Sequence, residues 1–151
     1  MPPDAQRERE FRGIGVSPGI AVGNILLLGA DDDPLPEYAI PTEDVPREMI
    51  RLEMAMIETR RQLHEIQQRV GEAMGGESAG IFDAHLHVVD DPSFVDEIYR
   101  DVREKRKNIE KSLFEVSERY AQTLLQMDDD YLRERATDIR DVTRRILRNL
   151  M

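Results

Sequence analysis

Residues 80–94, GIFDAHLHVVDDPSF, are the stretch around which we interpret the rest of the chain. His85 and His87, two of the three histidines, stand here among carboxylates and apolar residues. We predict a short helix that ends at the Asp91-Pro92 step, because Asp is a favoured N-cap and Pro is favoured at the first position of the helix that follows. This segment is therefore the first candidate for a site, either as a catalytic or metal pocket or as a docking face.

The apolar residues of this short helix cover more of its circumference than one neighbouring helix can bury. At helical spacing they fall into two adjoining stripes, and the acidic residues and His87 point outward. A helix this short and this apolar either lies between two elements or offers one stripe to a partner. The first stripe is Phe82, Leu86 and Val89; the second is Ile81, Ala84, His85 and Val88; the outward residues are Asp83, His87 and Asp90.

Length and composition predict one soluble, helix-rich domain. The chain has 151 residues, of which 34% are charged, 40% are hydrophobic and none is cysteine. That length suffices for one core that buries roughly two-thirds of the unfolded surface. Disulfides and thiolate metal sites are excluded, which fits a cytoplasmic protein. The longest purely apolar run, Ile25 to Leu28, is far shorter than the roughly 18 residues of a membrane span, and we expect no export signal.

The net charge of −10 argues against nucleic acid, whose phosphates would be repelled. An acidic surface favours a partner with a basic patch, because opposite charges raise the association rate. The same charge could also serve only to keep a helical protein in solution.

The first 41 residues differ in composition from the remainder. Residues 1–10 are predicted to be a disordered tail, and residues 29–41, with three aspartates and three prolines, a linker. Residues 11–28 are predicted to form short extended segments joined by a Ser17-Pro18-Gly19 turn. A strand that is apolar on both faces normally lies inside a sheet, yet no other convincing strand occurs in the chain.

Residues 42–151 show helical periodicity throughout. Thr42 or Asp44 is expected to cap a long first helix, whose heptad-spaced seam is interrupted by the polar Thr59, which either a small gap or a polar crossing would explain. Asn108 is expected to cap a later helix. The seam consists of Met49, Leu52, Met56, Thr59, Leu63, Ile66 and Val70. Phe94, Val95, Ile98 and Val102 follow at helical spacing; a later helix has a predicted buried stripe of Ile109, Leu113, Val116, Tyr120, Leu124 and Met127; and the last helix carries Leu132, Ala136, Ile139, Val142, Ile146 and Leu150 on one side.

Two catalytic interpretations find little support in the residues. The glycines near Gly13 and Gly15 do not complete a dinucleotide fingerprint, and no Gly-Lys-Ser/Thr phosphate loop occurs. His85 and His87 are two apart, so their side chains diverge by about 200° on a helix. A metal site would need further ligands from His64 or scattered acids, without the support of a motif.

Several stretches resemble the N-terminal part of enzyme I, the phosphoenolpyruvate-protein phosphotransferase of the bacterial sugar phosphotransferase system. They occur in the family's order and extend over nearly everything from Gly13 onward. The stretches are GVSPGIAVG at 15–23, IFDAH at 81–85, DDDYLRERATDIRDV at 128–142 and RRILRN at 144–149.

The resemblance implies a mainly α fold, a helical-hairpin bundle of four main helices with the second one broken, over residues 42–151. A short β segment at 11–28 would precede it, as the first piece of an incomplete α/β phosphohistidine domain. The implied activity is phosphoenolpyruvate-to-histidine phosphotransfer in the full-length protein, which would use Mg²⁺ and dimerise through a C-terminal part. None of His64, His85 or His87 occupies the family's phospho-accepting motif, so no catalytic residue and no cofactor is expected in this stretch.

The implied partner is the phosphocarrier HPr. Apolar contacts are expected from Val88, Phe94, Leu124 and Leu132, although Leu124 and Leu132 could also belong to the core. The acids would meet basic residues of the carrier, Arg135 an acid or a phosphohistidine, and His85 would donate a hydrogen bond. The matching positions are Glu77, Asp83, His85, Val88, Asp91, Phe94, Leu124, Tyr131, Leu132 and Arg135.

Other functions stay open at this point. The carrier could belong to the sugar branch or to the related nitrogen-regulatory branch. A structural or dimerisation module is favoured if the seam from Met49 to Val70 pairs between chains. A small metal-dependent enzyme built on His85 and His87 is the remaining alternative.

Overall fold

A computed structural model describes residues 14, 18–20, 22–23, 35–74 and 80–151. The chain divides into two compact units, Met1–Asp33 and Pro34–Met151. The fold below is that of the second unit.

The second unit consists of helices. A single 3₁₀ turn, Thr42–Asp44, leads into the long helix α1, and four α-helices follow in the described residues. None of these helices has the length and apolar character required to span a bilayer. The α-helices are α1 (Val45–Met74), α3 (Ile81–Val89), α4 (Pro92–Lys105), α5 (Ile109–Leu125) and α6 (Asp130–Leu150).

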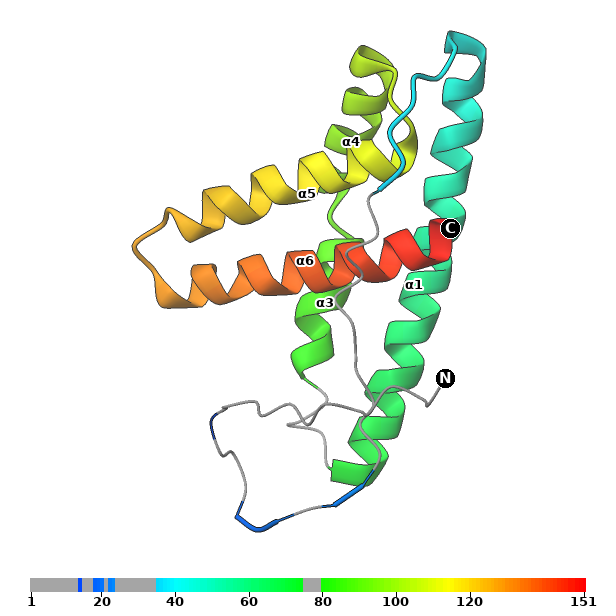
Figure 1. The fold of residues 1–151 in the computed structure, drawn as a ribbon. Helices are drawn as coiled ribbons and strands as arrows, with labels where there is room; N and C mark the ends of the chain where they lie inside the picture. The colour runs from blue at the N-terminus through cyan, green and yellow to red at the C-terminus, as the bar shows by residue number, and fades with distance from the viewer. Residues whose placement is uncertain (1–13, 15–17, 21, 24–34, 75–79) are drawn as a thin grey trace, which may run out of the picture. The chain divides into compact units, whose positions relative to one another are not determined.

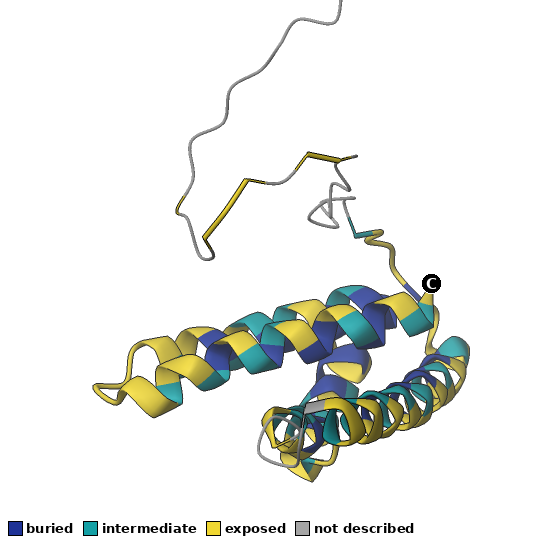
Figure 2. Ribbon diagram, turned by 90° about the horizontal axis from the view of Figure 1, so that it is seen from below, coloured by how far each residue is buried: buried dark blue, intermediate teal, exposed yellow. Residues whose placement is uncertain are grey.

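Helices α5 and α6 form an antiparallel hairpin that crosses over α1, α3 and α4, as Figure 1 shows. The base of the hairpin packs on α1 and α4, while α3 lies between α1 and α6. At the far end of the hairpin the connecting turn is exposed (Figure 2). The second half of α5 and the first half of α6 therefore extend beyond the main core.

The core lies where all five helices meet. Its members follow the predicted stripes: Leu52 and Leu63 of α1, Ile98 of α4 and Ile146 of α6 are at most 1% exposed. Met127 is an exception, because it lies in the exposed turn after α5 and is 39% exposed. The part of the α1 seam from Leu52 to Leu63 thus packs against helices of the same chain, whereas Ile66 and Val70 near its end are half-buried.

Thr59, the polar exception in the seam, is a polar crossing rather than a gap. Its side chain is 0% exposed, and its hydroxyl accepts a hydrogen bond of 2.8 Å from Asn149 Nδ2 on α6. Asn149 also accepts a hydrogen bond of 2.9 Å from Gln62 Nε2, one turn along α1. A small polar cluster therefore fixes the point at which α6 crosses α1.

The helix ends use acidic caps, with one difference from prediction. Asp91 accepts a hydrogen bond of 2.8 Å from the Ser93 amide at the start of α4, as the Asp-Pro step predicts. Asn108 precedes α5, but its side chain makes no capping bond. Instead Glu48 of α1, which is 6% exposed, accepts a hydrogen bond of 2.9 Å from the amide of Ile109.

The buried Asn108 side chain holds residues 35–40, which we call the strap. Its Oδ1 accepts a hydrogen bond of 3.1 Å from the Tyr38 amide, and its Nδ2 donates one of 2.9 Å to the Pro36 carbonyl. The strap pairs with the turn between α4 and α5 through the bridge of Ala39 and Lys107. Competition from these backbone groups explains why Asn108 does not cap α5.

The predicted break in the second helix lies where it was expected, because the Asp91 cap and Pro92 start a new helix. With α3 and α4 counted separately the described residues hold five α-helices, so the count of four main helices is not confirmed. Of residues 11–28, those described carry no strand; Pro18 and Gly19 form a bend in which Gly19 has a φ of 115°. The remainder of that segment, like the tail 1–10, lies outside the described residues, and the predicted strand is not confirmed.

Candidate functional site

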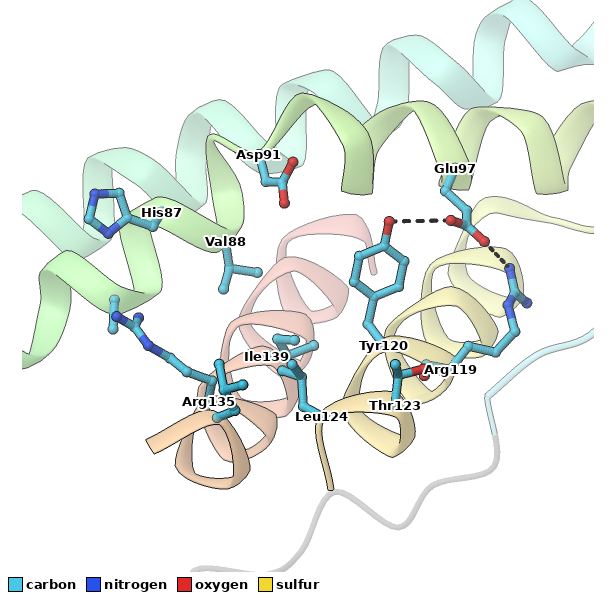
Figure 3. Close-up of a pocket in the computed structure, with 12 residues that line it drawn as sticks. His87, Val88, Asp91, Glu97, Arg119, Tyr120, Thr123, Leu124, Arg135 and Ile139 are labelled. Carbon is cyan, nitrogen blue, oxygen red and sulfur yellow. Dashed lines mark hydrogen bonds and ion pairs between the residues drawn. The ribbon is translucent and has the colours of Figure 1, made fainter. Parts of the chain in front are cut away.

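An open groove lies between α3 and the α5–α6 hairpin and has a volume of about 640 Å³. One wall comes from α3 and the start of α4, the other from α5 and α6, and Figure 3 shows their side chains pointing toward the space between. The lining residues are Ala84, His87, Val88, Asp91, Glu97, Arg119, Tyr120, Thr123, Leu124, Leu132, Arg135 and Ile139.

The groove exists because α3 cannot bury both of its apolar stripes. Leu86 and Val89 are buried toward the core, while Val88 on the second stripe remains half-buried and lines the groove. On the opposite wall Leu124 and Leu132 are also half-buried. These leucines are therefore not sealed in the core, which was the alternative that the sequence left open.

Half of the ten predicted contact residues line this groove: Val88, Asp91, Leu124, Leu132 and Arg135. Tyr131 lies directly beside it. The Tyr131 ring is 5.0 Å from the Arg135 guanidinium carbon, and Arg135 donates a hydrogen bond to its hydroxyl. Tyr131 is 59% exposed, so this stacked pair forms an accessible edge of the groove.

Asp83 and His85 lie on α3 but do not line the groove. Asp83 accepts a hydrogen bond of 2.7 Å from Gln67 of α1. His85 points toward α6, where its Nε2 is 3.4 Å from Asp138 Oδ1, and Phe82 packs edge-on against its ring. Glu77 lies outside the described residues.

Phe94 is not a surface contact, contrary to the prediction. It is 2% exposed and packs edge-on against Tyr120, with the ring centroids 5.4 Å apart. The prediction carried a position over from the family without accounting for the inward face of α4. Phe94 instead supports Tyr120, which lines the groove in its place.

The polar end of the groove holds residues that the sequence did not single out as contacts. Glu97 accepts hydrogen bonds of 3.2 Å from both Arg119 Nη2 and the Tyr120 hydroxyl (Figure 3). Burial raises the pKa of Tyr120, and the nearby carboxylates of Glu97 and Asp91 raise it further. In the sequence, Glu97 and Arg119 stand out only as polar residues next to the apolar stripes of α4 and α5. That pattern is the same for a binding site and for an ordinary surface ion pair.

The charges around the groove are mixed although the whole chain is acidic. Asp91 and Glu97 stand on the side of α3 and α4, while Arg119 and Arg135 stand on the hairpin. No cluster of three or more His, Asp or Glu side chains suited to a metal ion occurs in residues 35–74 and 80–151. The arrangement suits an amphipathic protein surface that carries both apolar and charged groups.

Comparisons with known proteins agree with the fold and with its position in larger proteins. Residues 12–135 match the family model described as PEP-utilising enzyme, N-terminal. The phosphoenolpyruvate-protein phosphotransferases of Bacillus sp. (strain S) and Geobacillus stearothermophilus are each 37% identical over 148 residues, which is 98% of this chain and 25% of either relative. This chain thus spans about a quarter of the length of these relatives.

Two solved structures share the architecture. The NMR solution structure of Enzyme I has a TM-score of 0.75 and 28% identity, over 80% of this chain and 48% of that one. A structure described as the N-terminal domain of Enzyme 1 - Nitrogen has a TM-score of 0.69 and 28% identity, over 79% of this chain and 51% of that one.

Proposed function

Because this chain belongs to the family of PEP-utilising enzymes, whose N-terminal domain it matches over residues 12–135, we propose that it is the docking part of a phosphoenolpyruvate-protein phosphotransferase. Its partner is an HPr-like phosphocarrier, which brings a histidine to a phosphohistidine domain elsewhere in the protein. The single observation that supports this role most strongly is the groove between α3 and the α5–α6 hairpin.

The groove has the composition of a protein interface. Val88, Leu124 and Leu132 supply apolar area, and Tyr131 and Arg135 provide the aromatic and guanidinium groups that are enriched at interface centres. The net charge of −10 favours encounter with a basic carrier. Arg135, on the hairpin side, is the group that meets an acid or a phosphohistidine of the partner.

The chemistry of phosphate transfer is assigned to other parts of the protein. The three histidines have different surroundings. His87 lines the groove, His85 contacts Asp138, and His64 is exposed on α1. We propose that the phosphoenolpyruvate and Mg²⁺ sites of the full-length enzyme, and its dimer contact, lie in the C-terminal part of longer relatives, as the resemblance to enzyme I implies. We also propose a cytoplasmic location.

Two branches of the phosphotransferase system are candidates for the partner. The sugar branch is the first candidate, because the sequence resembles enzyme I of the sugar phosphotransferase system and its relatives are named phosphoenolpyruvate-protein phosphotransferase. The structural likeness to the N-terminal domain of Enzyme 1 - Nitrogen favours the nitrogen branch as the second candidate. Titration with the carrier of each branch distinguishes them by affinity.

Isothermal titration calorimetry of this chain with HPr, at low and high salt, tests the docking role. We expect binding that weakens with salt and that is lost in Val88→Glu and Arg135→Glu. The controls make the same changes away from the groove: Ile57→Glu on the exposed face of α1, and Arg133→Glu, whose side chain is 44% exposed. Absence of binding to either carrier at low salt, or equal loss in groove and control variants, contradicts the proposal.

A further inference from the structure

Glu97 stands at the polar end of the groove, more than one turn into α4 and beyond the positions that match the family's docking surface. Its side chain is 25% exposed, so it is neither sealed in the core nor freely solvated. A role for this carboxylate in binding the carrier rests on the proposed docking function.

Glu97 has a free acceptor position that faces the groove. Its Oε1 accepts a hydrogen bond from Arg119 Nη2 at 3.2 Å and lies 3.3 Å from Arg100 Nη2. Its Oε2 accepts from the Tyr120 hydroxyl at 3.2 Å. A carboxylate offers about four lone-pair positions. Of the contacts described here three use those positions, so Oε2 retains room for one more donor on the side of Tyr120, a lining residue (Figure 3).

A chain of ion pairs holds the Glu97 carboxylate in place. Arg119 Nη2, which donates to Glu97, also donates at 3.2 Å to Asp101 Oδ1. The Asp101 side chain is 4% exposed and is fixed in turn by Lys105 Nζ at 2.8 Å. A charge that is already positioned loses less conformational entropy when it binds a partner than a free side chain does.

The surroundings of Oε2 favour a cation. Asp91 lies on the same wall of the groove and adds a second negative charge. The Tyr120 hydroxyl donates to Glu97 Oε2, and burial and these two carboxylates raise the pKa of Tyr120. Arg119 and Arg100 both pair with Glu97 through Oε1, and Arg135 stacks on Tyr131, so Oε2 is the oxygen left for a donor from the partner.

We propose that Glu97 is a specificity-determining contact of the docking groove and that, with Asp91 beside it, it receives one cationic side chain, Lys or Arg, of the carrier protein. Arg119 and Asp101 are positioning residues for this contact. The groove then contacts the carrier through two residues of opposite charge. Glu97 binds a basic group of the carrier at one end, and Arg135 binds an acidic or phosphorylated group at the other.

Calorimetric titrations of the whole chain with HPr at several salt concentrations test this contact. Glu97→Gln removes the charge and is expected to weaken the Kd about fivefold at low salt, the effect of one partly buried ion pair. The dependence of log Kd on salt becomes shallower, because one ion pair fewer is screened. Glu97→Asp keeps the charge and is expected to restore most of the salt dependence.

Glu118→Gln is the matched control, because Glu118 on α5 is also a carboxylate in an ion pair with arginine, Arg140 Nε at 2.9 Å, but does not line the groove. It is expected to leave the Kd and its salt dependence unchanged. If wild-type protein binds and Glu97→Gln behaves like Glu118→Gln, the contact is refuted while docking stands, even when the variant melts at a lower temperature. If wild-type protein does not bind, the docking function fails and this contact fails with it.

Discussion

Replacing Asn108 by alanine removes the side chain that joins the strap to the helical bundle. Asn108 is 0% exposed. The change deletes its acceptor bond from the Tyr38 amide, 3.1 Å, and its donor bonds to the Pro36 carbonyl, 2.9 Å, and to Glu110 Oε2, 2.7 Å. We expect a large loss of stability for a change of one side chain.

The loss of unfolding free energy depends on whether water can replace each hydrogen bond that the former partners of Asn108 lose. Pro36 and Tyr38 are exposed, so water can replace their bonds and each costs about 1 kcal/mol. Glu110 is 3% exposed, and a carboxylate left short of a donor in the interior costs about 2 kcal/mol. The expected total is about 4 kcal/mol, a large part of the 5–15 kcal/mol that is typical of a folded domain.

Urea unfolding followed by circular dichroism at 222 nm measures this loss. With a slope of about 2 kcal/mol per molar urea, the midpoint is expected to fall by about 2 M. The control Asn149→Ala breaks two bonds between α1 and α6 but none to the strap, and is expected to cost about 2 kcal/mol with Ile40 protection unchanged. Hydrogen exchange of the Ile40 amide, which donates to the Arg106 carbonyl at 2.8 Å, reports on the strap itself. A midpoint shift below about 0.5 M with unchanged Ile40 protection refutes the anchoring role.

Three further predictions concern the bundle. Ile146→Ala opens a cavity at a residue with 0% exposure and is expected to cost about 2–4 kcal/mol by thermal or urea unfolding; a cost below about 1 kcal/mol contradicts its place in the core. Thr59→Val keeps the shape but leaves Asn149 without its hydroxyl acceptor, with an expected cost of about 1 kcal/mol by the same assay; a stabilised variant shows that the polar crossing is unnecessary. The hydrogen bonds from Arg140 lower the pKa of Glu118, so this pair stabilises the protein above the ordinary carboxyl pKa of 4.5 and loses its effect as pH falls through the lowered value. Glu118→Gln is thus expected to be slightly less stable than wild type at pH 7, by about 0.5 kcal/mol, and equal to it at strongly acid pH; a gap that persists in acid excludes the ion pair as its cause.

Periodicity sufficed to predict the helices because burial and helical spacing coincide in them. The seam of α1 runs through Leu52, Thr59 and Leu63, each at most 1% exposed, as its heptad spacing predicts. What periodicity could not supply was the role of single polar residues. Asn108 has the right type and place for a cap, but only the tertiary approach of the strap shows that its side chain is used elsewhere.

The site was predicted in part. The excess apolar surface of α3 correctly indicated that one stripe is left over, and Val88 lines the groove as a result. Phe94 failed as a contact because its role was carried over from the family, although its helical spacing with Ile98 and Val102 already placed it on the buried face of α4. Glu97 and Arg119 were missed because an ion pair between two helices has no signature in the sequence of either.

Mapping the surface that a carrier covers tests the central claim most directly. Backbone amide shifts of the ¹⁵N-labelled chain are recorded as HPr is added. We expect the largest changes along the groove, at Val88 on α3 and at Leu124 and Arg135 on the hairpin. Changes centred instead on the exposed outer face of α1, around Met54 and Ile57, would contradict it.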